Sequence, residues 1–303
     1  MTWQQRRDLE AMLQKEAHEP EPLPIEQLRE GFAAMMAQFP APEDVRSTPT
    51  ELGGRPALRV EPEGEPRPGT ILYLHGGSWV LGSPATGFVN TANLVSRTRV
   101  AAISLDYRLA PEHPFPAAVD DCLAAYRALL DAGTDPATIV FAGDSAGGGL
   151  SVSTCLAARA AGLPQPAAIV AFSPGVDLTR AGASMVTREG RDPFFTRDGF
   201  GHTTAMYLGD QDPAQPLLSP AVYADLAGLP PMLLQVGTNE LLLDDAVRLA
   251  ARAAEADVDV ILDVTAGVPH VFQAFGPALD EAGRALDRAA LFISQHLGVS
   301  AAR

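Results

Sequence analysis

Ser145 lies between two glycines, where residues 143–147 read Gly-Asp-Ser-Ala-Gly. Residues 137–142 before it are apolar and β-branched, as in a buried strand, and residues 148–158 after it are small and apolar at helical spacing. A tight strand-to-helix turn of this kind, a nucleophile elbow, holds its serine strained with the hydroxyl exposed. Ser145 is therefore the candidate nucleophile. The alternative is a glycine-rich turn whose serine only caps a helix.

A second glycine pair follows a strand predicted at 70–74, in the sequence His-Gly-Gly-Ser-Trp at 75–79. A serine that attacks a carbonyl needs N–H donors for the oxygen that becomes negative, and each donor stabilises it by roughly 3–4 kcal/mol. Backbone N–H groups of this loop and of the residue after the serine can supply them. The predicted oxyanion hole comprises Gly76, Gly77, Ser78 and Ala146. We expect His75 to brace the loop rather than to act as a base.

The serine hydroxyl is a weak nucleophile and needs a base oriented by an acid. In chains with a nucleophile elbow these residues follow the order serine, acid, histidine. The last predicted strand covers 258–264, and His270 stands in the predicted loop at its carboxyl end. His270 is therefore the predicted base. His296 falls in a closing helix and His113 in a proline-rich connector, so neither is expected to be catalytic.

Several carboxylates compete for the role of the acid. Glu240 comes just after the strand predicted at 231–236. Asp244 and Asp245 fall at the start of the next helix, where negative charge complements the helix dipole. Asp177 follows an earlier strand. We rank Glu240 first, then Asp244, then Asp177.

The predicted elements give an α/β fold. Strands are expected at 45–51, 56–61, 70–74, 100–105, 138–142, 167–172, 231–236 and 258–264, and helices at 2–17, 25–38, 86–98, 116–131, 147–161, 241–256 and 278–297. The first two strands look antiparallel. The alternation that follows implies a mostly parallel sheet with helices on both faces. The long interruption at 179–225 carries a cluster of four aromatic residues, which favours a lid over the site rather than a surface loop.

The composition excludes several other classes of protein. Hydrophobic residues make up 47% of the 303, yet no stretch reaches the ~18 apolar residues of a membrane span. The net charge of −15 and the scattered basic residues argue against nucleic acid or an anionic membrane as a partner. The start of the chain has no apolar signal-peptide core. Cys122 and Cys155 lack metal-ligand spacing, so we expect buried free thiols in a reducing cytoplasm.

Three motifs together resemble those of a known family. They are the run at 75–79, Asp-Tyr-Arg-Leu-Ala-Pro-Glu-His-Pro-Phe-Pro-Ala at 106–117, and Gly-Asp-Ser-Ala-Gly-Gly at 143–148. In this order they are similar to the signatures of the bacterial branch (family IV) of the hormone-sensitive lipase family of α/β-hydrolases. There are two departures. The third glycine usual in the first motif is Ser78, and the acid position, commonly aspartate in Asp-x-Leu-x-Asp, is Glu240, as in some members.

The resemblance implies an α/β-hydrolase fold with a mostly parallel central sheet, flanking helices and a helical cap. The catalytic domain then comprises residues 44–178 and 226–303, and the cap comprises residues 1–43 and 179–225. The middle motif reads as a rigid, buried, non-catalytic connector. Within it, Asp106 is available to pair with Arg108 or to hold the oxyanion loop. Asp144 is expected to support the elbow, and Trp79 to pack beside the acyl pocket.

The implied activity is that of a serine carboxylesterase without cofactor or metal. It hydrolyses short-chain acyl esters through an acyl-enzyme, with Ser145, Glu240 and His270 as catalytic residues. The partner is a small-molecule ester. Neither nucleic acid nor a stable membrane association is expected, and a homodimer is left open. The alternatives are a lactone or amide hydrolase with the same residues, and a ligand-binding protein on the same scaffold.

Overall fold

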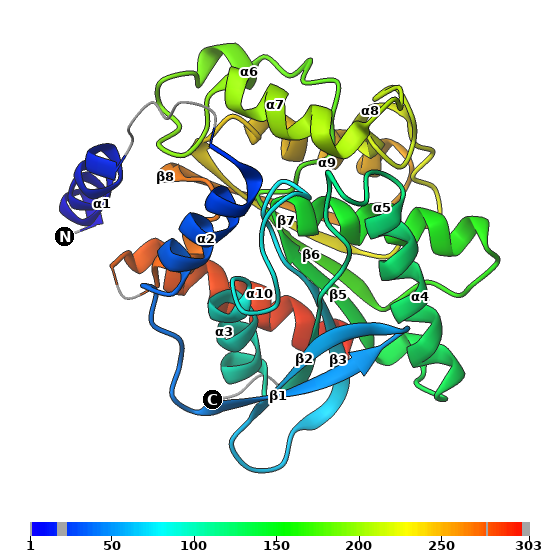
Figure 1. Ribbon diagram of the computed structural model, residues 1–303. Helices are drawn as coiled ribbons and strands as arrows, with labels where there is room; N and C mark the ends of the chain where they lie inside the picture. The colour runs from blue at the N-terminus through cyan, green and yellow to red at the C-terminus, as the bar shows by residue number, and fades with distance from the viewer. Residues whose placement is uncertain (1, 17–22, 277, 299–303) are drawn as a thin grey trace.

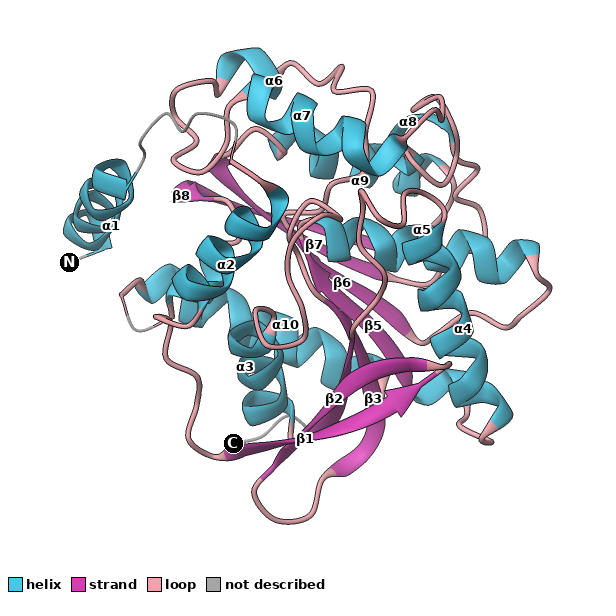
Figure 2. Cartoon of the chain, in the orientation of Figure 1, coloured by secondary structure: helices cyan, strands magenta, loops and turns pink. Residues whose placement is uncertain are grey.

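The computed structural model describes residues 2–16, 23–276 and 278–298. Its centre is an eight-stranded sheet with the order β1-β2-β4-β3-β5-β6-β7-β8 (Figures 1 and 2). β1 pairs with β2, and β2 with β4, in antiparallel register, while the remaining neighbours run parallel. Helices pack on both faces, so the predicted fold class is confirmed.

The bounds of the elements agree with the predicted ones to within a few residues at most ends. The strands are β1 (Val45–Leu52), β2 (Arg55–Pro62), β3 (Arg67–Leu74), β4 (Val100–Leu105), β5 (Ile139–Asp144), β6 (Ala168–Phe172), β7 (Met232–Asn239) and β8 (Val260–Pro269). The longer helices are α1 (Thr2–Glu16), α2 (Ile25–Met36), α3 (Phe88–Thr98), α4 (Ala117–Asp131), α5 (Ala146–Ala160), α7 (Arg197–Leu208), α9 (Leu243–Glu255) and α10 (Asp280–His296). Short turns of helix are α6 (Ser184–Thr187), α8 (Pro220–Tyr223), η1 (Pro136–Thr138) and η2 (Phe272–Phe275).

The central strands are buried on both faces, because successive side chains of a strand point to opposite sides. Leu72 and Phe141 pack in one cluster with residues of α4, α5 and α9. Their neighbours Ile71 and Val140 pack in a second cluster with residues of α3 and α10. This double burial explains why the strands read as continuous apolar runs in the sequence. No helix among the described residues is long and apolar enough to cross a membrane.

The end of β8 differs from the prediction. The strand continues to Pro269, so the residues expected to form a loop before His270 are extended and pair with β7. Gly267 and Pro269 resemble loop residues in the sequence. However, the Thr238 hydroxyl accepts from the Gly267 N–H at 2.8 Å, and the ladder resumes at Asn239 and Pro269 after a shift in register. His270 therefore follows directly from a paired strand.

The two N-terminal helices cover the chain around the sequence-predicted site. Leu9 and Leu13 of α1 lie in an apolar cluster with Val268, Phe272, Phe275 and other residues of η2 and α10. Arg6 forms an ion pair with Glu281 beside that cluster. Arg29 of α2 donates to the carbonyls of Val80 and Ala110 at 2.9 and 3.0 Å, and so binds the chain just after the glycine pair and the middle motif.

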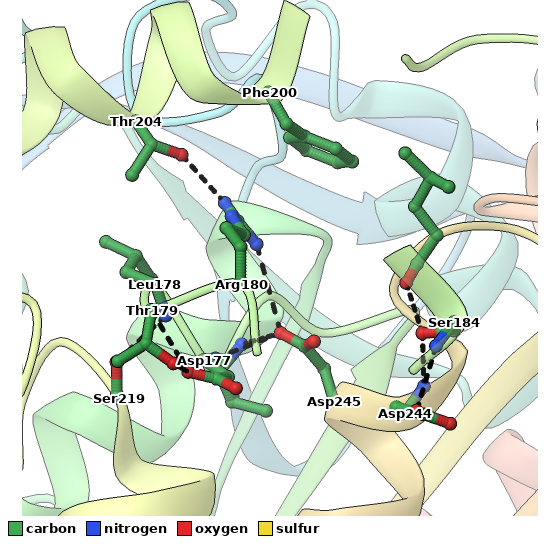
Figure 3. Close-up of polar contacts among 12 residues, drawn as sticks. Asp177, Leu178, Thr179, Arg180, Ser184, Phe200, Thr204, Ser219, Asp244 and Asp245 are labelled. Carbon is green, nitrogen blue, oxygen red and sulfur yellow. Dashed lines mark hydrogen bonds and ion pairs between the residues drawn. The ribbon is translucent and has the colours of Figure 1, made fainter. Parts of the chain in front are cut away.

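Residues 179–225 form α6, α7 and α8, which lie above the sheet on the side where α9 begins (Figure 1). Met185 and Phe200 pack against Leu241 and Leu242, which follow β7. At the start of this segment, Arg180 donates to Thr204 at 3.0 Å, lies over the ring of Phe200, and faces Asp245 at 4.0 Å (Figure 3). Apolar and ionic contacts thus both fasten the segment to the chain after β7.

Deleting residues 1–40 is expected to expose the apolar cluster around Phe272 while the sheet stays folded. The truncated protein should aggregate and bind an apolar dye more strongly, because a large uncovered apolar patch promotes association. Light scattering and dye fluorescence measure this, and circular dichroism checks the fold. Trp3→Ser is the matched control, since that side chain is 60% exposed on the same helix. A truncated protein as soluble and as dye-free as the full chain would contradict the expectation.

Candidate active site

Ser145 occupies the sharp turn between β5 and α5 with φ 53° and ψ −117°, a conformation that non-glycine residues rarely adopt. The turn needs glycine at two places. A Cβ at Gly147 would overlap the carbonyl oxygen of Leu74, and one at Gly143 would overlap the backbone of Gly147. The strained elbow is therefore present. Ser145 as a whole is 6% exposed, and Gly175 in the loop after β6 donates to its carbonyl.

Glu240 and His270 meet at the carboxyl ends of β7 and β8. The Nδ1 atom of His270 lies 2.7 Å from Oε2 of Glu240, and both residues are buried. A carboxylate acceptor at Nδ1 places the proton there, which leaves Nε2 as the basic nitrogen. Nε2 is itself buried and has no hydrogen-bond partner among the described residues. The imidazole thus presents an unoccupied basic atom.

The other oxygen of Glu240 is also engaged. Oε1 accepts from the Gly237 N–H at 2.6 Å and from the Ser173 hydroxyl at 2.9 Å.

The pKa of His270 is raised above its ordinary value. Burial by itself lowers this pKa, but the hydrogen bond and charge of Glu240, together with the charges of Asp192 and Asp144, outweigh that effect. The protonated imidazole that forms when His270 accepts a proton is therefore stabilised in place.

The other acidic candidates have different partners. Asp244 accepts from the Ser184 N–H at 2.9 Å, and Asp245 from the N–H groups of Val176 and Asp177 at 2.9 Å each (Figure 3). Asp177 pairs with an arginine of α9, Arg248. Of the three ranked carboxylates, only Glu240 contacts His270 within the described residues. The sequence predicts only that Asp244 and Asp245 complement the helix dipole. It does not predict these hydrogen bonds, which join α9 to the chain after β6.

The glycine loop after β3 is fastened from two sides. His75 places Nδ1 2.8 Å from the Gly76 carbonyl and stacks on Tyr107 at 4.2 Å, and the Tyr107 hydroxyl donates to the His75 carbonyl at 2.6 Å. Burial lowers the pKa of His75 to about 4, so the ring is neutral. On the other side, Asp144 accepts from the Tyr73 hydroxyl at 2.6 Å and from the Gly76 N–H. His75 and Asp144 thus brace the loop and elbow, as predicted.

The remaining predicted oxyanion donors are unoccupied. Within the part of the chain that the structure describes, no protein acceptor is bound to the N–H groups of Gly77, Ser78 or Ala146. Gly77 and Ser78 both have positive φ, 121° and 53°, which turns the backbone sharply at this point. Gly76 differs from them, because its N–H is already engaged by Asp144.

The expectation for Asp106 is wrong. Arg108 pairs instead with Asp121 of α4 at 2.6 Å, because Asp121 presents both oxygens to the guanidinium and also accepts from the Arg108 N–H. The contact to the glycine loop comes from Tyr107. Among the described residues, neither His113 nor His296 contacts Glu240 or His270, and His296 packs against Phe292.

Asp192, in the 179–225 segment, was missed by the sequence analysis, whereas Phe195 is one of the four aromatic residues noted there. The carboxylate of Asp192 accepts from the N–H groups of Phe194, Phe195 and Leu241 at 2.9, 3.1 and 2.8 Å. The ring of Phe195 stands edge-on to His270, with centroids 5.0 Å apart. Burial raises the pKa of Asp192 to about 6. The available signal was an Asp-Pro pair ahead of two phenylalanines, since aspartate commonly binds the backbone two residues on.

Comparison with known proteins matches this geometry to an enzyme family. A sequence model described as alpha/beta hydrolase fold matches residues 71–274. An acetyl-hydrolase of Streptomyces hygroscopicus is 44% identical over 229 residues, 76% of each chain. A crystal structure of a hormone-sensitive lipase from a metagenome library superposes with a TM-score of 0.93 at 44% identity, over 96% of this chain and 98% of that one.

The chain belongs to the hormone-sensitive lipase family of α/β-hydrolases. The family resemblance noted from three motifs is therefore confirmed. An esterase of Acinetobacter venetianus is 35% identical over 249 residues, 82% of each chain, which agrees with this placement. The enzyme is a carboxylic ester hydrolase. Among the described residues of this hydrolase, no group of three or more histidine, cysteine or acidic side chains is arranged to hold a metal ion.

Asp192→Asn is expected to lower the pKa of His270, because a nearby negative charge favours the imidazolium. NMR titration of the histidine ring measures this directly and needs no substrate. The difference between the two proteins in the protonated fraction of His270 should be largest above about pH 6, because Asp192 of the wild type is then ionised. Asp198→Asn is the matched control, since that carboxylate is exposed in the first turn of α7. An unchanged His270 titration in Asp192→Asn would show that its charge does not reach the imidazole.

Proposed function

We propose that this hydrolase cleaves short-chain acyl esters through an acyl-enzyme, with Ser145 as nucleophile, His270 as base and Glu240 as the orienting acid. The observation that carries the proposal is the buried 2.7 Å contact between Glu240 and His270, which leaves Nε2 basic and free. Ser145 is linked to this pair through the end of β6. Its N–H donates to the carbonyl of Phe172, and Ser173, the residue after Phe172, donates to Glu240.

The proposed reaction proceeds in two halves. Ser145 Oγ attacks the ester carbonyl carbon while Nε2 of His270 takes its proton, and Glu240 stabilises the imidazolium. The tetrahedral intermediate collapses, the alcohol leaves with the proton from Nε2, and the acyl group stays on Oγ. Water then gives a proton to Nε2 and attacks the acyl carbon to form a second tetrahedral intermediate. This intermediate collapses, Ser145 Oγ leaves with the proton from Nε2, and the acid is released.

The negative oxygen of both intermediates is assigned to the oxyanion hole. The free N–H groups of Gly77, Ser78 and Ala146 support this assignment, because a preorganised donor without a protein acceptor can bind developing charge without first breaking a bond. Gly76 supports the hole through its N–H to Asp144, which fixes the loop that carries Gly77 and Ser78.

The preference for short acyl chains rests on Trp79. Its buried indole stacks on Tyr207 of α7 at 4.7 Å. The indole also lies against Gly149 and Gly175, whose N–H groups both donate to the carbonyl of Ser145. The indole thus occupies space beside the nucleophile turn that a long acyl chain would need. The acetyl-hydrolase name of a relative agrees with a small acyl group.

Residues 1–43 and 179–225 are proposed to act as the cap of the site, over a catalytic domain of residues 44–178 and 226–303. Two contacts support this division. Phe195 packs on His270, and Arg29 of α2 binds the carbonyls that follow the glycine loop.

The two buried free cysteines, Cys122 and Cys155, support a cytoplasmic location.

A lactone or an amide would meet the same catalytic residues as an ester. Comparing the rates of hydrolysis of esters, lactones and amides separates these substrate classes.

Ser145→Ala should remain folded and lose activity by roughly 10⁴-fold or more, because the residues of such a triad act as a unit. The measurement is hydrolysis of p-nitrophenyl esters of increasing acyl length, with lactones and amides alongside. The wild type should be fastest on acetyl and butyryl esters. Covalent labelling by a fluorophosphonate, lost in the variant, identifies the nucleophile. A variant that keeps a tenth of the wild-type rate would refute Ser145, and an unlabelled, inactive wild type would favour a binding protein.

Glu240→Gln and Asp244→Asn distinguish the two leading acids. Glutamine is nearly isosteric but cannot stabilise the imidazolium, so kcat should fall by about 10³–10⁴. Asp244→Asn keeps an oxygen acceptor for the Ser184 N–H and should cost less than about tenfold in kcat, with a small loss of stability. Steady-state kinetics and thermal unfolding of both variants decide the matter. The reverse ranking would move the acid to Asp244.

A further inference from the structure

One buried hydroxyl connects the acid to the chain that carries the base. Ser173 follows directly after β6 and is completely buried. Its Oγ lies 2.9 Å from Oε1 of Glu240 and 3.0 Å from the backbone nitrogen of Val271, the residue after His270. Three strand ends, those of β6, β7 and β8, therefore meet at one side chain.

The chemistry of these partners fixes the direction of both hydrogen bonds. The Val271 N–H can only donate, so it uses a lone pair of the hydroxyl, and the single hydroxyl proton must then go to the carboxylate. A hydrogen bond to an ionised group is the stronger kind. With Gly237 on the same oxygen and His270 on the other, the Glu240 carboxylate has no freedom to turn away from Nδ1.

The backbone on both sides of this hydroxyl is strained. Ser173 has φ 47° and Val271 has φ 48°, both in the left-handed region, where a β-branched residue such as valine is a marked outlier. Such conformations persist only where surrounding contacts over-determine them. The Ser173 N–H is held by the Gln235 carbonyl at 2.7 Å, so the hydroxyl is aimed from a fixed backbone.

We infer that Ser173 is a positioning residue of the reaction: its hydroxyl aligns the Glu240 carboxylate on His270 and holds the backbone that follows His270. The inference rests on the proposed function of Glu240 and His270. Among the described residues, the Ser173 hydroxyl is bound to Glu240 and Val271 and not to the Ser145 hydroxyl, so its effect on the rate is exerted through Glu240. Loss of the hydroxyl leaves the carboxylate free to rotate and the part-buried Val271 N–H without its acceptor.

Two variants separate the hydroxyl from the backbone conformation. Ser173→Ala removes the hydroxyl and keeps the strain at this residue, whereas Ser173→Gly removes the hydroxyl and relieves the strain, because glycine adopts positive φ readily. Both should lower kcat about 10- to 100-fold with KM changed less than about threefold, as expected for loss of a hydrogen bond to a charged group. The glycine variant should unfold at a higher temperature than the alanine variant.

The readouts include one that does not depend on catalysis. The proton resonance of the His270 Nδ1–H, bonded to Glu240, should move upfield or broaden in both variants. Ser153→Ala is the matched control, because that buried hydroxyl donates to the Leu217 carbonyl at 2.7 Å, outside the site, and its removal should leave kcat and the resonance unchanged.

The outcomes are distinguishable. A glycine variant with wild-type kcat and an unshifted resonance overturns the inference, since the residue would then serve only the turn. If the wild type neither hydrolyses esters nor reacts with a fluorophosphonate, the proposed function fails, and the resonance still tests whether the Ser173 hydroxyl aligns Glu240 on His270. If the alanine variant does not fold, the glycine variant carries the test, because its backbone conformation is the permitted one.

Discussion

Glu240 is a carboxylate with no exposed surface, and much of the site follows from the need to compensate that charge. A buried ion is tolerated only where it is paired or hydrogen-bonded. Here the compensation comes from three directions, Gly237 on its own turn, Ser173 at the end of β6 and His270 at the end of β8. The same contacts that make the charge tolerable also orient the imidazole. The tolerance of the buried charge and the orientation of the imidazole therefore depend on one set of hydrogen bonds.

The sequence predicts the elbow, the parallel strands and the positions of Glu240 and His270, because each of these is determined by residues near it in the chain. Glycines at 143 and 147 are required by backbone contacts that no side chain could enter, so the elbow is visible as a motif. The parallel strands are buried on both faces and read as apolar runs. The position of His270 follows from chain order, and Glu240 from its place after a strand. Each of these features lies within a few residues of its own signal.

The features that were missed depend on distant contacts. The pairing that extends β8 through Gly267 and Pro269 is set by β7, so turn residues misled the prediction. Asp106 was expected to pair with Arg108 or to hold the oxyanion loop, but Asp121 of α4 pairs with Arg108 and Tyr107 binds the loop. The roles of Asp192 and Ser173 appear only when separate segments are brought together. Neither residue type is distinctive at its position, since aspartate and serine are common wherever a chain turns.

The link between Asp192 and the Leu241 N–H has a kinetic consequence for the size of the substrate. Displacing the 192–195 segment to admit a bulky group would break a hydrogen bond to the peptide next to Glu240 and draw Phe195 away from His270. Making room for a large substrate would then require breaking the contacts that hold the chain around Glu240 and His270 in place. Under the proposed function, an ester that displaces this segment would turn over slowly even when it binds, so selectivity would reside in the rate of reaction rather than in affinity.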